Sequence, residues 1–375
     1  MKKGWICAAL ALALCFPAKA AEVEIPAPSA VLMDAATGTV LYEKDAHEAL
    51  PPASVTKVMT LLLVMEALED GTIGWDDTVT ASEHAAGKGG SQVYLEPGEG
   101  MSMDEMLKSV VVSSANDCAT ALAEHVAGSE EAFVERMNAR ARELGMNDTH
   151  FVNCTGLDDD PAAAEHRSSA WDIAIMSREL LRHEAIKEYT TIWMDSIRDG
   201  SFELANTNKL VYWYPGCTGL KTGYTSTARY CLSASAERNG VEYIAVVMHG
   251  ETADSRNRDA ETLLSYAFAN YRLIPLHDGK ELPALPVELG KKKVVPLCFD
   301  GAAYQLAVKG GQPEYALTLP ARLAAPIQAG QQIGNLRVSV GGEQIAEVPV
   351  CAAEDIPRIG FGGILAKLAL SLVGI

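Results

Sequence analysis

Hydrophobic residues recur at helical spacing through much of the first 275 residues and form short strand-like runs elsewhere. Helical patterns cover 54–69, a stretch that begins at the Ser102–Glu105 capping box, 116–127, 132–144, 169–181 and 259–271. Strand-like runs occupy 30–34 and 39–43, which form a predicted hairpin, and 218–224, 230–236 and 243–249. This order predicts an α+β domain in which helices pack on an antiparallel sheet.

Helical periodicity ends beyond Leu273. Short strand-like pieces then alternate with glycine-containing turns, at 293–299, 304–308, 316–319, 335–340 and 344–350. We therefore predict a first domain over 21–275 and a small all-β domain over 277–352.

The N-terminus carries an apolar segment outside these domains. Lys2 and Lys3 precede an apolar run that ends at Phe16, and Ala18 and Ala20 supply small residues for a signal peptidase. The run is shorter than the about 20 residues that a membrane-spanning helix needs. Residues 1–20 are therefore predicted to be a signal peptide, and the mature protein to be exported and extracytoplasmic.

The C-terminal tail, 356–375, is also apolar. Placed on a helix, one face would hold Phe361, Ile364, Leu365, Leu368 and Leu372. This amphipathic pattern predicts an interfacial anchor on the outer face of the cytoplasmic membrane. The alternative is a helix that packs on its own domain.

Charge and cysteine content narrow the classes of partner. A formal net charge of −18 opposes contact with phosphate backbones, so nucleic acid is excluded as a partner. The histidines and cysteines show no metal-ligand spacing, so we expect no metal and no cofactor. An even number of cysteines follows the signal peptide, which makes disulfides plausible in an exported protein: Cys118, Cys154, Cys217, Cys231, Cys298 and Cys351. Their pairing stays open, although Cys217 and Cys231 flank a predicted hairpin and could face each other.

The first candidate for chemistry is Ser54-Val55-Thr56-Lys57. One helical turn separates Ser54 from Lys57, so both side chains can face one cleft. A serine hydroxyl is a weak nucleophile until a base takes its proton, and a buried lysine can be neutral enough to do so. S-x-x-K is common by chance, and a solvated helix start is the alternative interpretation.

The second candidate is Ser114-Ala115-Asn116. A hydroxyl can relay a proton to a leaving amine, and a side-chain amide can hold a peptide group. S-x-N is equally common by chance, and Ser255-Arg256-Asn257 matches it too. Helix capping or turn formation is therefore the alternative for Ser114 and Asn116.

The third candidate, Lys221-Thr222-Gly223, lies in a predicted strand before a hairpin turn that starts at Tyr224. The glycine permits close backbone approach, and an edge strand can pair with an extended peptide. The lysine and threonine offer a positive charge and a hydroxyl to a carboxylate. K-T-G is the most specific of the three signals, expected by chance in about one chain in ten of this length.

In this order, S-x-x-K, S-x-N and K-T-G resemble the signature of the penicillin-recognising serine acyl enzymes. The match is closest to the low-molecular-mass penicillin-binding proteins that act as D-Ala-D-Ala carboxypeptidases (peptidase family S11). The resemblance covers about 27–275 and includes Asp34-Ala35-Ala36-Thr37-Gly38, Pro52-Ala53, Gly156-Leu157-Asp158 and Gly219–Thr225. It implies a β-lactamase/transpeptidase-like domain, an antiparallel sheet flanked by helices with a helical subdomain. The β domain and tail resemble the same subgroup more loosely.

The implied activity is removal of the terminal D-alanine from peptidoglycan stem pentapeptides, with β-lactams as inhibitors. Ser54 would be the nucleophile, Lys57 its general base and Ser114 the proton shuttle. The resemblance makes Asn116 a ligand of the substrate's peptide group.

The remaining implied roles concern charge at the two ends of the reacting group. Lys221 would supply electrostatic stabilisation, and Thr222, next to Gly223, would bind the terminal carboxylate. The backbone N–H groups of Ser54 and Tyr224 would form the oxyanion hole. Arg256, at the end of the next predicted strand, matches the arginine that recognises the free carboxylate. A surface arginine is the alternative there.

The sequence departs from the family pattern at two places. Ala115 stands where the subgroup usually has glycine, and the segment 158–167 is longer than expected. The longer segment is expected to place His166 and Arg167 near the rim of the cleft, without a catalytic role.

Three other functions stay open. A β-lactamase needs a base for its deacylating water, but no clear E-x-x-x-N segment lies between Asn116 and Lys221. A D,D-endopeptidase would use the same residues. A non-catalytic penicillin-binding-like protein would have no chemical reason to keep the full set.

Overall fold

The computed structural model describes residues 23–277 and 281–365. The predicted signal peptide, and the part of the predicted anchor beyond residue 365, lie outside these ranges. The chain divides into two compact units, Glu22–Asn270 and the part from Tyr271 onward. This division falls a few residues before the predicted domain boundary at 275–277.

A five-stranded sheet forms the framework of the first unit, in the order β2-β1-β9-β8-β7 with antiparallel neighbours. Its strands are β1 (Ser29–Asp34), β2 (Val40–Lys44), β7 (Cys217–Thr225), β8 (Arg229–Arg238) and β9 (Val241–Gly250). The predicted N-terminal hairpin and the three later strands are confirmed. Strand β1 is buried throughout and joins the hairpin to the later strands by pairing with both β2 and β9.

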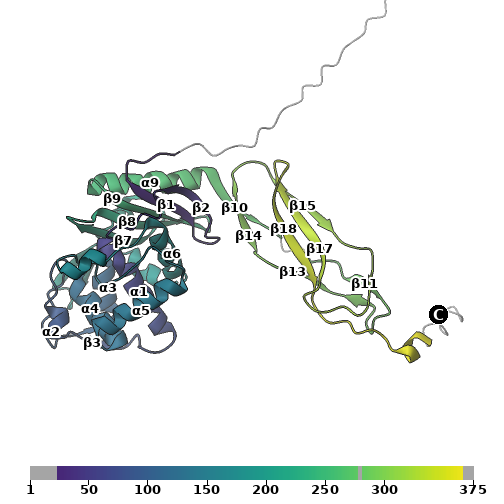
Figure 1. The fold of residues 1–375 in the computed structure, drawn as a ribbon, viewed down its shortest axis with the longest axis horizontal. Coiled ribbons are helices and arrows are strands. Elements are labelled where there is room, and N and C mark those ends of the chain that lie inside the picture. Colours follow the sequence, from purple (N-terminus) through teal and green to yellow (C-terminus); the bar gives the residue numbers. More distant parts are fainter. Residues whose placement is uncertain (1–22, 278–280, 366–375) are drawn as a thin grey trace, which may run out of the picture. The chain divides into compact units, whose positions relative to one another are not determined.

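Helices cover both faces of this sheet (Figure 1). Helix α9 (Ala253–Asn270) packs on β8 and β9, and α6 (Ala170–Leu180) packs on β1 and β9 from the other side. The other longer helices are α1 (Lys57–Glu69), α3 (Met103–Val112), α4 (Asn116–Ala127) and α5 (Glu130–Glu143). The short elements are β3 (Thr78–Thr80), α2 (Glu83–Ala86), β4 (Gly100–Ser102), η2 (Pro161–Glu165), α7 (Ile186–Thr190), β5 (Met194–Ile197), β6 (Phe202–Ala205) and α8 (Leu210–Trp213). The predicted α+β class and the Ser102 cap of α3 are confirmed.

Helix α9 begins six residues earlier than the sequence predicts. The Ser255 N–H donates to the Thr252 hydroxyl at 3.0 Å, and the Thr252 N–H donates to Ser255 Oγ at 3.0 Å. This reciprocal pair acts as a capping box, with serine in place of the usual glutamate. Arg256 therefore lies in the first turn of α9, and its predicted place at a strand end is wrong.

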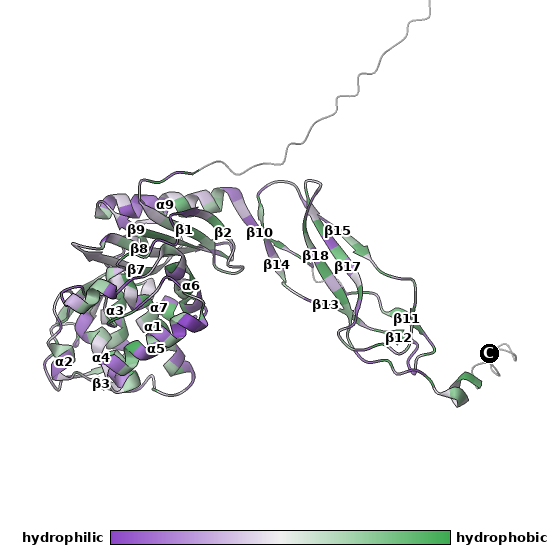
Figure 2. Ribbon diagram, viewed as in Figure 1, coloured by the Kyte–Doolittle hydropathy of each residue, from purple (hydrophilic) through white to green (hydrophobic). Residues whose placement is uncertain are grey.

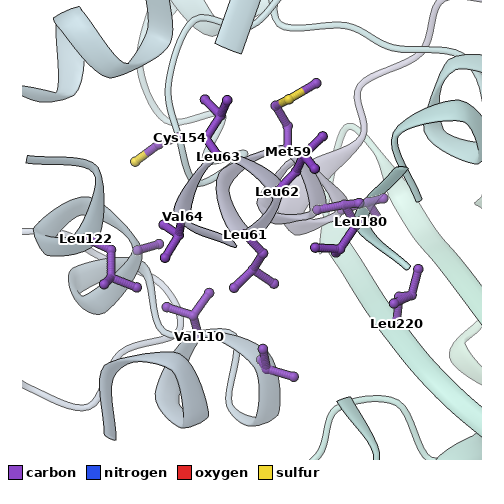
Figure 3. Close-up of a cluster of buried hydrophobic side chains, with 14 of the residues drawn as sticks. Met59, Leu61, Leu62, Leu63, Val64, Val110, Leu122, Cys154, Leu180 and Leu220 are labelled. Atoms are coloured by element: carbon purple, nitrogen blue, oxygen red, sulfur yellow. The ribbon is translucent and has the colours of Figure 1, made fainter. Parts of the chain in front are cut away.

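Helix α1 forms the centre of the helical part because it is apolar on almost every side. Figure 3 shows Val110 from α3, Leu122 from α4, Leu180 from α6 and Leu220 from β7 around it. The helix does not start at Ser54 as predicted. Residues Ala53–Thr56 form a separate 3-10 turn, η1, closed by a Val55 N–H to Pro52 carbonyl bond of 3.2 Å.

The described residues of the second unit form three small sheets. The first pairs β10 (Tyr271–Pro275) with β14 (Tyr304–Val308). In the second, β11 (Leu285–Glu288) lies between β12 (Val294–Val295) and β16 (Leu323–Ala324). The third has the order β13 (Leu297–Phe299), β18 (Glu343–Ala352), β17 (Gln332–Val340) and β15 (Pro313–Thr318). Every regular element described between Tyr271 and Ala352 is a strand, so the all-β class predicted for this part is confirmed. Its core includes Val338, Val348 and Val350.

Residues 361–365 form a short helical turn, which Figure 2 shows as predominantly hydrophobic. Phe361 and Leu365 are 78% and 53% exposed. Within the described ranges, none of the helices has the length and hydrophobicity needed to cross a bilayer.

All six cysteines after residue 22 are free thiols, so the expected disulfides are absent from the described residues. Cys217 lies opposite Ala236 and Cys231 lies opposite Gly223, because the turn of this hairpin is at 226–228 rather than at Tyr224. Cys298 lies directly opposite Cys351 across β13 and β18.

Leu62 tests the central position of α1, since its side chain is fully buried. We expect Leu62→Ala to lower the free energy of unfolding by about 2–5 kcal/mol through lost burial and a new cavity. Urea unfolding measures this change. Met194→Ala, at a residue that is 59% exposed, is the control and should stay within about 0.5 kcal/mol. Equal midpoints for the two variants would contradict the packing.

Candidate active site

The turn that carries Ser54 is held between two close backbone approaches. A Cβ added to Gly223 of strand β7 would lie 2.7 Å from the Pro52 carbonyl oxygen and 3.0 Å from the Ser54 nitrogen. On another side, a Cβ on Gly156 would lie 1.8 Å from the Ala53 carbonyl oxygen. Ala53 itself has a φ of +47°, a left-handed conformation that costs energy and persists only where the surroundings enforce it. Glycines at two distant positions thus allow the fold to hold Ser54 in a strained turn.

The Lys57 amine has three neighbours that together define its role. Its Nζ lies 3.0 Å from Ser54 Oγ, 2.6 Å from Asn116 Oδ1 and 2.8 Å from the Thr155 carbonyl oxygen. The Asn116 and Thr155 oxygens can only accept hydrogen bonds. A neutral amine has two N–H groups and one lone pair, so both N–H groups are used on these oxygens. The lone pair is then directed at the Ser54 hydroxyl.

Burial favours the neutral, unprotonated form of the Lys57 amine. The Lys57 side chain is fully buried, and this burial lowers its pKa from 10.5 to about 7. At neutral pH a large share of the molecules therefore carries the free base. The solvated helix start, which was the alternative for the S-x-x-K pattern, is not what the structure shows.

Asn116 is oriented by contacts on each side of its amide. Its Nδ2 donates to the Gly89 carbonyl at 2.7 Å, so its Oδ1 faces Lys57. Its backbone N–H donates to the Ser91 carbonyl at 2.6 Å. Asn116 therefore connects the loop around Gly89 to the Lys57 amine, in addition to the substrate contact that the sequence predicts.

Ser114 lies next to Asn116, at the junction of α3 and α4. Its φ is +65° and its side chain is 4% exposed. The N-cap of α4 is Ala115, which has no side-chain cap. The capping alternative therefore does not describe Ser114 or Asn116, whereas it does describe Ser255 at the start of α9.

Strand β7 and helix α9 add two further buried basic groups, Lys221 and Arg256. Burial lowers the pKa of Lys221 well below its ordinary value, and the positive charges of Lys57 and Arg256 add to this shift. Burial also lowers the pKa of Arg256 to about 10, so the guanidinium stays charged at neutral pH. In the described ranges, no ion pair joins any of the three to a carboxylate. The charge of the Arg256 guanidinium is therefore uncompensated within the described ranges, which suits an anionic ligand.

The predicted ligand residues on β7 differ in exposure. Thr222 is 5% exposed and donates to the Thr207 hydroxyl at 2.7 Å. Tyr224 is 56% exposed, and its ring lies 4.4 Å from that of Tyr230 on β8. Arg256 contacts β8 as well, donating to the Cys231 carbonyl at 3.4 Å. Its burial rules out the surface-arginine alternative.

Two backbone carbonyl groups of the site were not predicted from the sequence. The Thr155 and Gly89 carbonyls position Lys57 and Asn116, and no side-chain pattern marks them. The predicted position of His166 near the rim of the cleft is wrong, because this residue is 3% exposed and contacts Thr56, which belongs to the turn that carries Ser54. Arg167 is exposed. Across the described ranges, no cluster of three or more side chains is suited to hold a metal ion.

This fold and this site define a serine acyl-transfer enzyme of the β-lactamase/transpeptidase-like class. Residues 17–252 match the family model for D-alanyl-D-alanine carboxypeptidase, and 274–358 match that for the C-terminal domain of penicillin-binding protein 5. The chain belongs to the D-alanyl-D-alanine carboxypeptidase family.

Relatives and solved structures agree with this assignment. D-alanyl-D-alanine carboxypeptidase DacF of Bacillus subtilis is 44% identical over 92% of this chain and 89% of its own. DacC of Escherichia coli is 34% identical over 92% and 89%. Penicillin-binding protein 5 from Haemophilus influenzae matches 90% of this chain and 99% of its own, with a TM-score of 0.78 and 32% identity. Ampicillin-bound penicillin-binding protein D2 from Listeria monocytogenes matches 66% and 100%, with a TM-score of 0.60 and 31% identity.

The pKa of Lys57 predicts the pH dependence of acylation. Because only the neutral amine can take the Ser54 proton, the acylation rate should fall about tenfold per pH unit below about pH 7 and level off above it. The measurement is the second-order rate constant for labelled penicillin between about pH 5 and about pH 9. Lys57→Arg, which cannot accept a proton, should lose about 10²–10⁴-fold at every pH. A flat profile for the unaltered enzyme would contradict the role of Lys57.

Gly223→Ala tests the close approach of β7 to the nucleophile turn. The new methyl group would push on Pro52 and the Ser54 amide, so we expect acylation to fall by about 10²–10³-fold, as when one oxyanion donor is lost. Gly362→Ala is the control, since a Cβ there meets nothing within 4 Å. Full activity of Gly223→Ala would show that the turn has room to shift.

Proposed function

We propose that this serine-type D-Ala-D-Ala carboxypeptidase trims peptidoglycan stem pentapeptides through an acyl-enzyme on Ser54. Ser54 Oγ attacks the carbonyl between the two D-alanines while its proton passes to the neutral Lys57 amine. Ser114 relays a proton to the departing amine of the terminal D-alanine. Water then hydrolyses the ester and restores the serine. β-Lactams acylate the same hydroxyl.

One observation carries this proposal: the Lys57 Nζ lies 3.0 Å from Ser54 Oγ with both of its N–H groups committed to other oxygens. A general base must lie within hydrogen-bond reach of the proton that it abstracts and must have a pKa near the working pH. The Lys57 amine meets both conditions. An amine in this arrangement accepts a proton from one direction only, which is that of the nucleophile.

The buried basic groups account for the choice of a C-terminal residue. We assign recognition of the substrate's free carboxylate to Lys221, Thr222 and Arg256, because a terminal carboxylate would pair with the Arg256 charge and favour the protonated form of Lys221. Asn116 holds the substrate's peptide group, and the N–H groups of Ser54 and Tyr224 stabilise the oxyanion. Gly223 has no side chain, so the turn that carries Ser54 can lie close to β7. The same glycine lets the backbone of the substrate peptide approach this strand.

Two other activities of the same fold are less favoured, for different reasons. A D,D-endopeptidase cuts a peptide bond that is not followed by a free D-alanine carboxylate, so it gains little from a buried Arg256. A β-lactamase needs a base for its deacylating water, and within the described ranges no ion pair joins the Lys57 amine to a carboxylate that could act as one. The carboxylate requirement therefore favours the carboxypeptidase.

The two ends of the chain support a proposal for where the enzyme acts. We infer that 1–20 direct export and that the tail, 356–375, attaches the enzyme to the outer face of the cytoplasmic membrane. The exposure of Phe361 and Leu365 supports the second point, since apolar side chains on a helix face can insert into the interface. The unit over 21–275 would do the chemistry.

Labelled penicillin and a donor-stripped peptide test the proposal. Mass mapping should locate a single β-lactam adduct on Ser54, and Ser54→Ala should abolish both this adduct and D-alanine release from diacetyl-Lys-D-Ala-D-Ala. Arg256→Ala should lower kcat/KM by about 10-fold to 10²-fold, because a charge-assisted contact is worth about 1.5–3 kcal/mol. The same variant should lose less on the amidated peptide. An adduct elsewhere, or equal losses on both peptides, would count against these assignments.

A further inference from the structure

His166 belongs to the longer segment at 158–167, yet it lies under the nucleophile turn with both ring nitrogens occupied. The Val152 N–H donates to its Nδ1 at 3.0 Å, and its Nε2 lies 2.8 Å from the Thr56 hydroxyl. A backbone N–H can only donate, so Nδ1 is the acceptor and a neutral ring carries its proton on Nε2.

Burial keeps this ring neutral. It lowers the pKa of His166 to about 4, and the positive charges of His150 and Lys57 act in the same direction. At the working pH of the enzyme, His166 is therefore a neutral donor at Nε2. It neither supplies nor removes a proton during turnover.

The direction of the next hydrogen bond follows from the first. The Thr56 hydroxyl accepts from His166 Nε2 and uses its own proton on the Ala53 carbonyl oxygen, 2.8 Å away. A chain of hydrogen bonds, each donated in the same direction, thus runs from the Val152 amide through His166 and Thr56 to the Ala53 carbonyl.

The Ala53 carbonyl belongs to the same rigid peptide group as the Ser54 N–H. Holding the carbonyl oxygen in place therefore fixes the direction of that N–H, which is the proposed oxyanion donor. The Ala53–Ser54 peptide group needs such support, because Ala53 has a φ of +47°, and this left-handed conformation costs energy in a residue other than glycine. A Cβ at Gly156 would lie 1.8 Å from the same carbonyl oxygen, so a side chain at this position would displace it.

We propose that His166 is a positioning residue for the oxyanion hole and acts through Thr56 on the Ala53–Ser54 peptide group. This inference rests on the proposed function, in which the Ser54 N–H stabilises negative charge in the transition state. It assigns to the longer segment a part in catalysis rather than in shaping the cleft.

The experiment compares variants of both members of the chain. Thr56→Val removes the hydroxyl at nearly constant shape, and Thr56→Ser restores it. His166→Leu removes both nitrogens, and His166→Gln keeps an N–H that can reach Thr56. We expect Thr56→Val and His166→Leu to lower kcat on diacetyl-Lys-D-Ala-D-Ala by about 10–10²-fold with little change in KM, because the lost contact matters only in the transition state. Thr56→Ser should stay within about threefold of the unaltered enzyme, and His166→Gln should lie between it and His166→Leu.

The loss of kcat in a double variant distinguishes a positioning role of His166 from a role in packing alone. Once Thr56→Val is present, adding His166→Gln should cost no further kcat, since both act on one carbonyl. Asp160→Ala is the control for a loosened segment, because it removes only the side-chain bond to the Ala162 N–H, and it should leave kcat unchanged. Urea midpoints of all variants, read beside the kinetics, show whether each one is folded. If His166→Leu does not fold, His166→Gln and Thr56→Val still decide the question.

Three results would overturn the inference: losses that add, a loss confined to KM, or full kcat in Thr56→Val. In each case penicillin would still label Ser54 in the unaltered enzyme, and the proposed function would stand. Absence of that adduct in the unaltered enzyme would instead remove the proposed function itself.

Discussion

The structure depends on one contact, between the Lys57 amine and the Ser54 hydroxyl at 3.0 Å. The contact is productive only because two oxygens from other parts of the chain, those of Asn116 and Thr155, take both N–H groups of the neutral amine. Desolvation is the second requirement, since an exposed lysine would remain a cation at the pH of the reaction. Helix α1 satisfies it by being apolar on nearly every side, so that the base lies at the start of the most deeply packed helix.

Much of the site is unfavourable for folding and is held in place by the rest of the unit. Within the described ranges, Lys57, Lys221 and Arg256 are buried without a carboxylate partner. Burial drives the two lysines toward their neutral forms, and the unpaired charge of Arg256 is expensive to bury. Ala53 and Ser114 both have positive φ values without being glycine. These costs occur together where chemistry is proposed, and they are the features that a substrate carboxylate and an oxyanion would use.

The sequence predicted what side-chain patterns encode. Short strand-like runs predicted β7–β9 and the hairpin, and the three short motifs predicted which hydroxyl, amide and amines meet. The sequence did not predict the 3-10 turn at Ser54 or the role of the Thr155 carbonyl, because no side-chain pattern marks either of them. The start of α9 was missed because its capping box uses Ser255 in place of an acid. The position of His166 was predicted wrongly because an inserted segment is usually exposed. No residue near it in the sequence indicates its contact with Thr56, 110 residues earlier, in which His166 Nε2 lies 2.8 Å from Thr56 Oγ1.

The most direct test of this account is the titration of the Lys57 amine itself in the folded, unacylated enzyme. Protein with ¹³C at the lysine Cε can be followed by NMR through its pH range, with Lys57→Arg used to assign the signal. The account predicts one lysine with a pKa of about 7, far below the ordinary value near 10.5. A Lys57 signal that titrates near 10.5 would contradict it, because the amine would then be protonated when it has to act as a base.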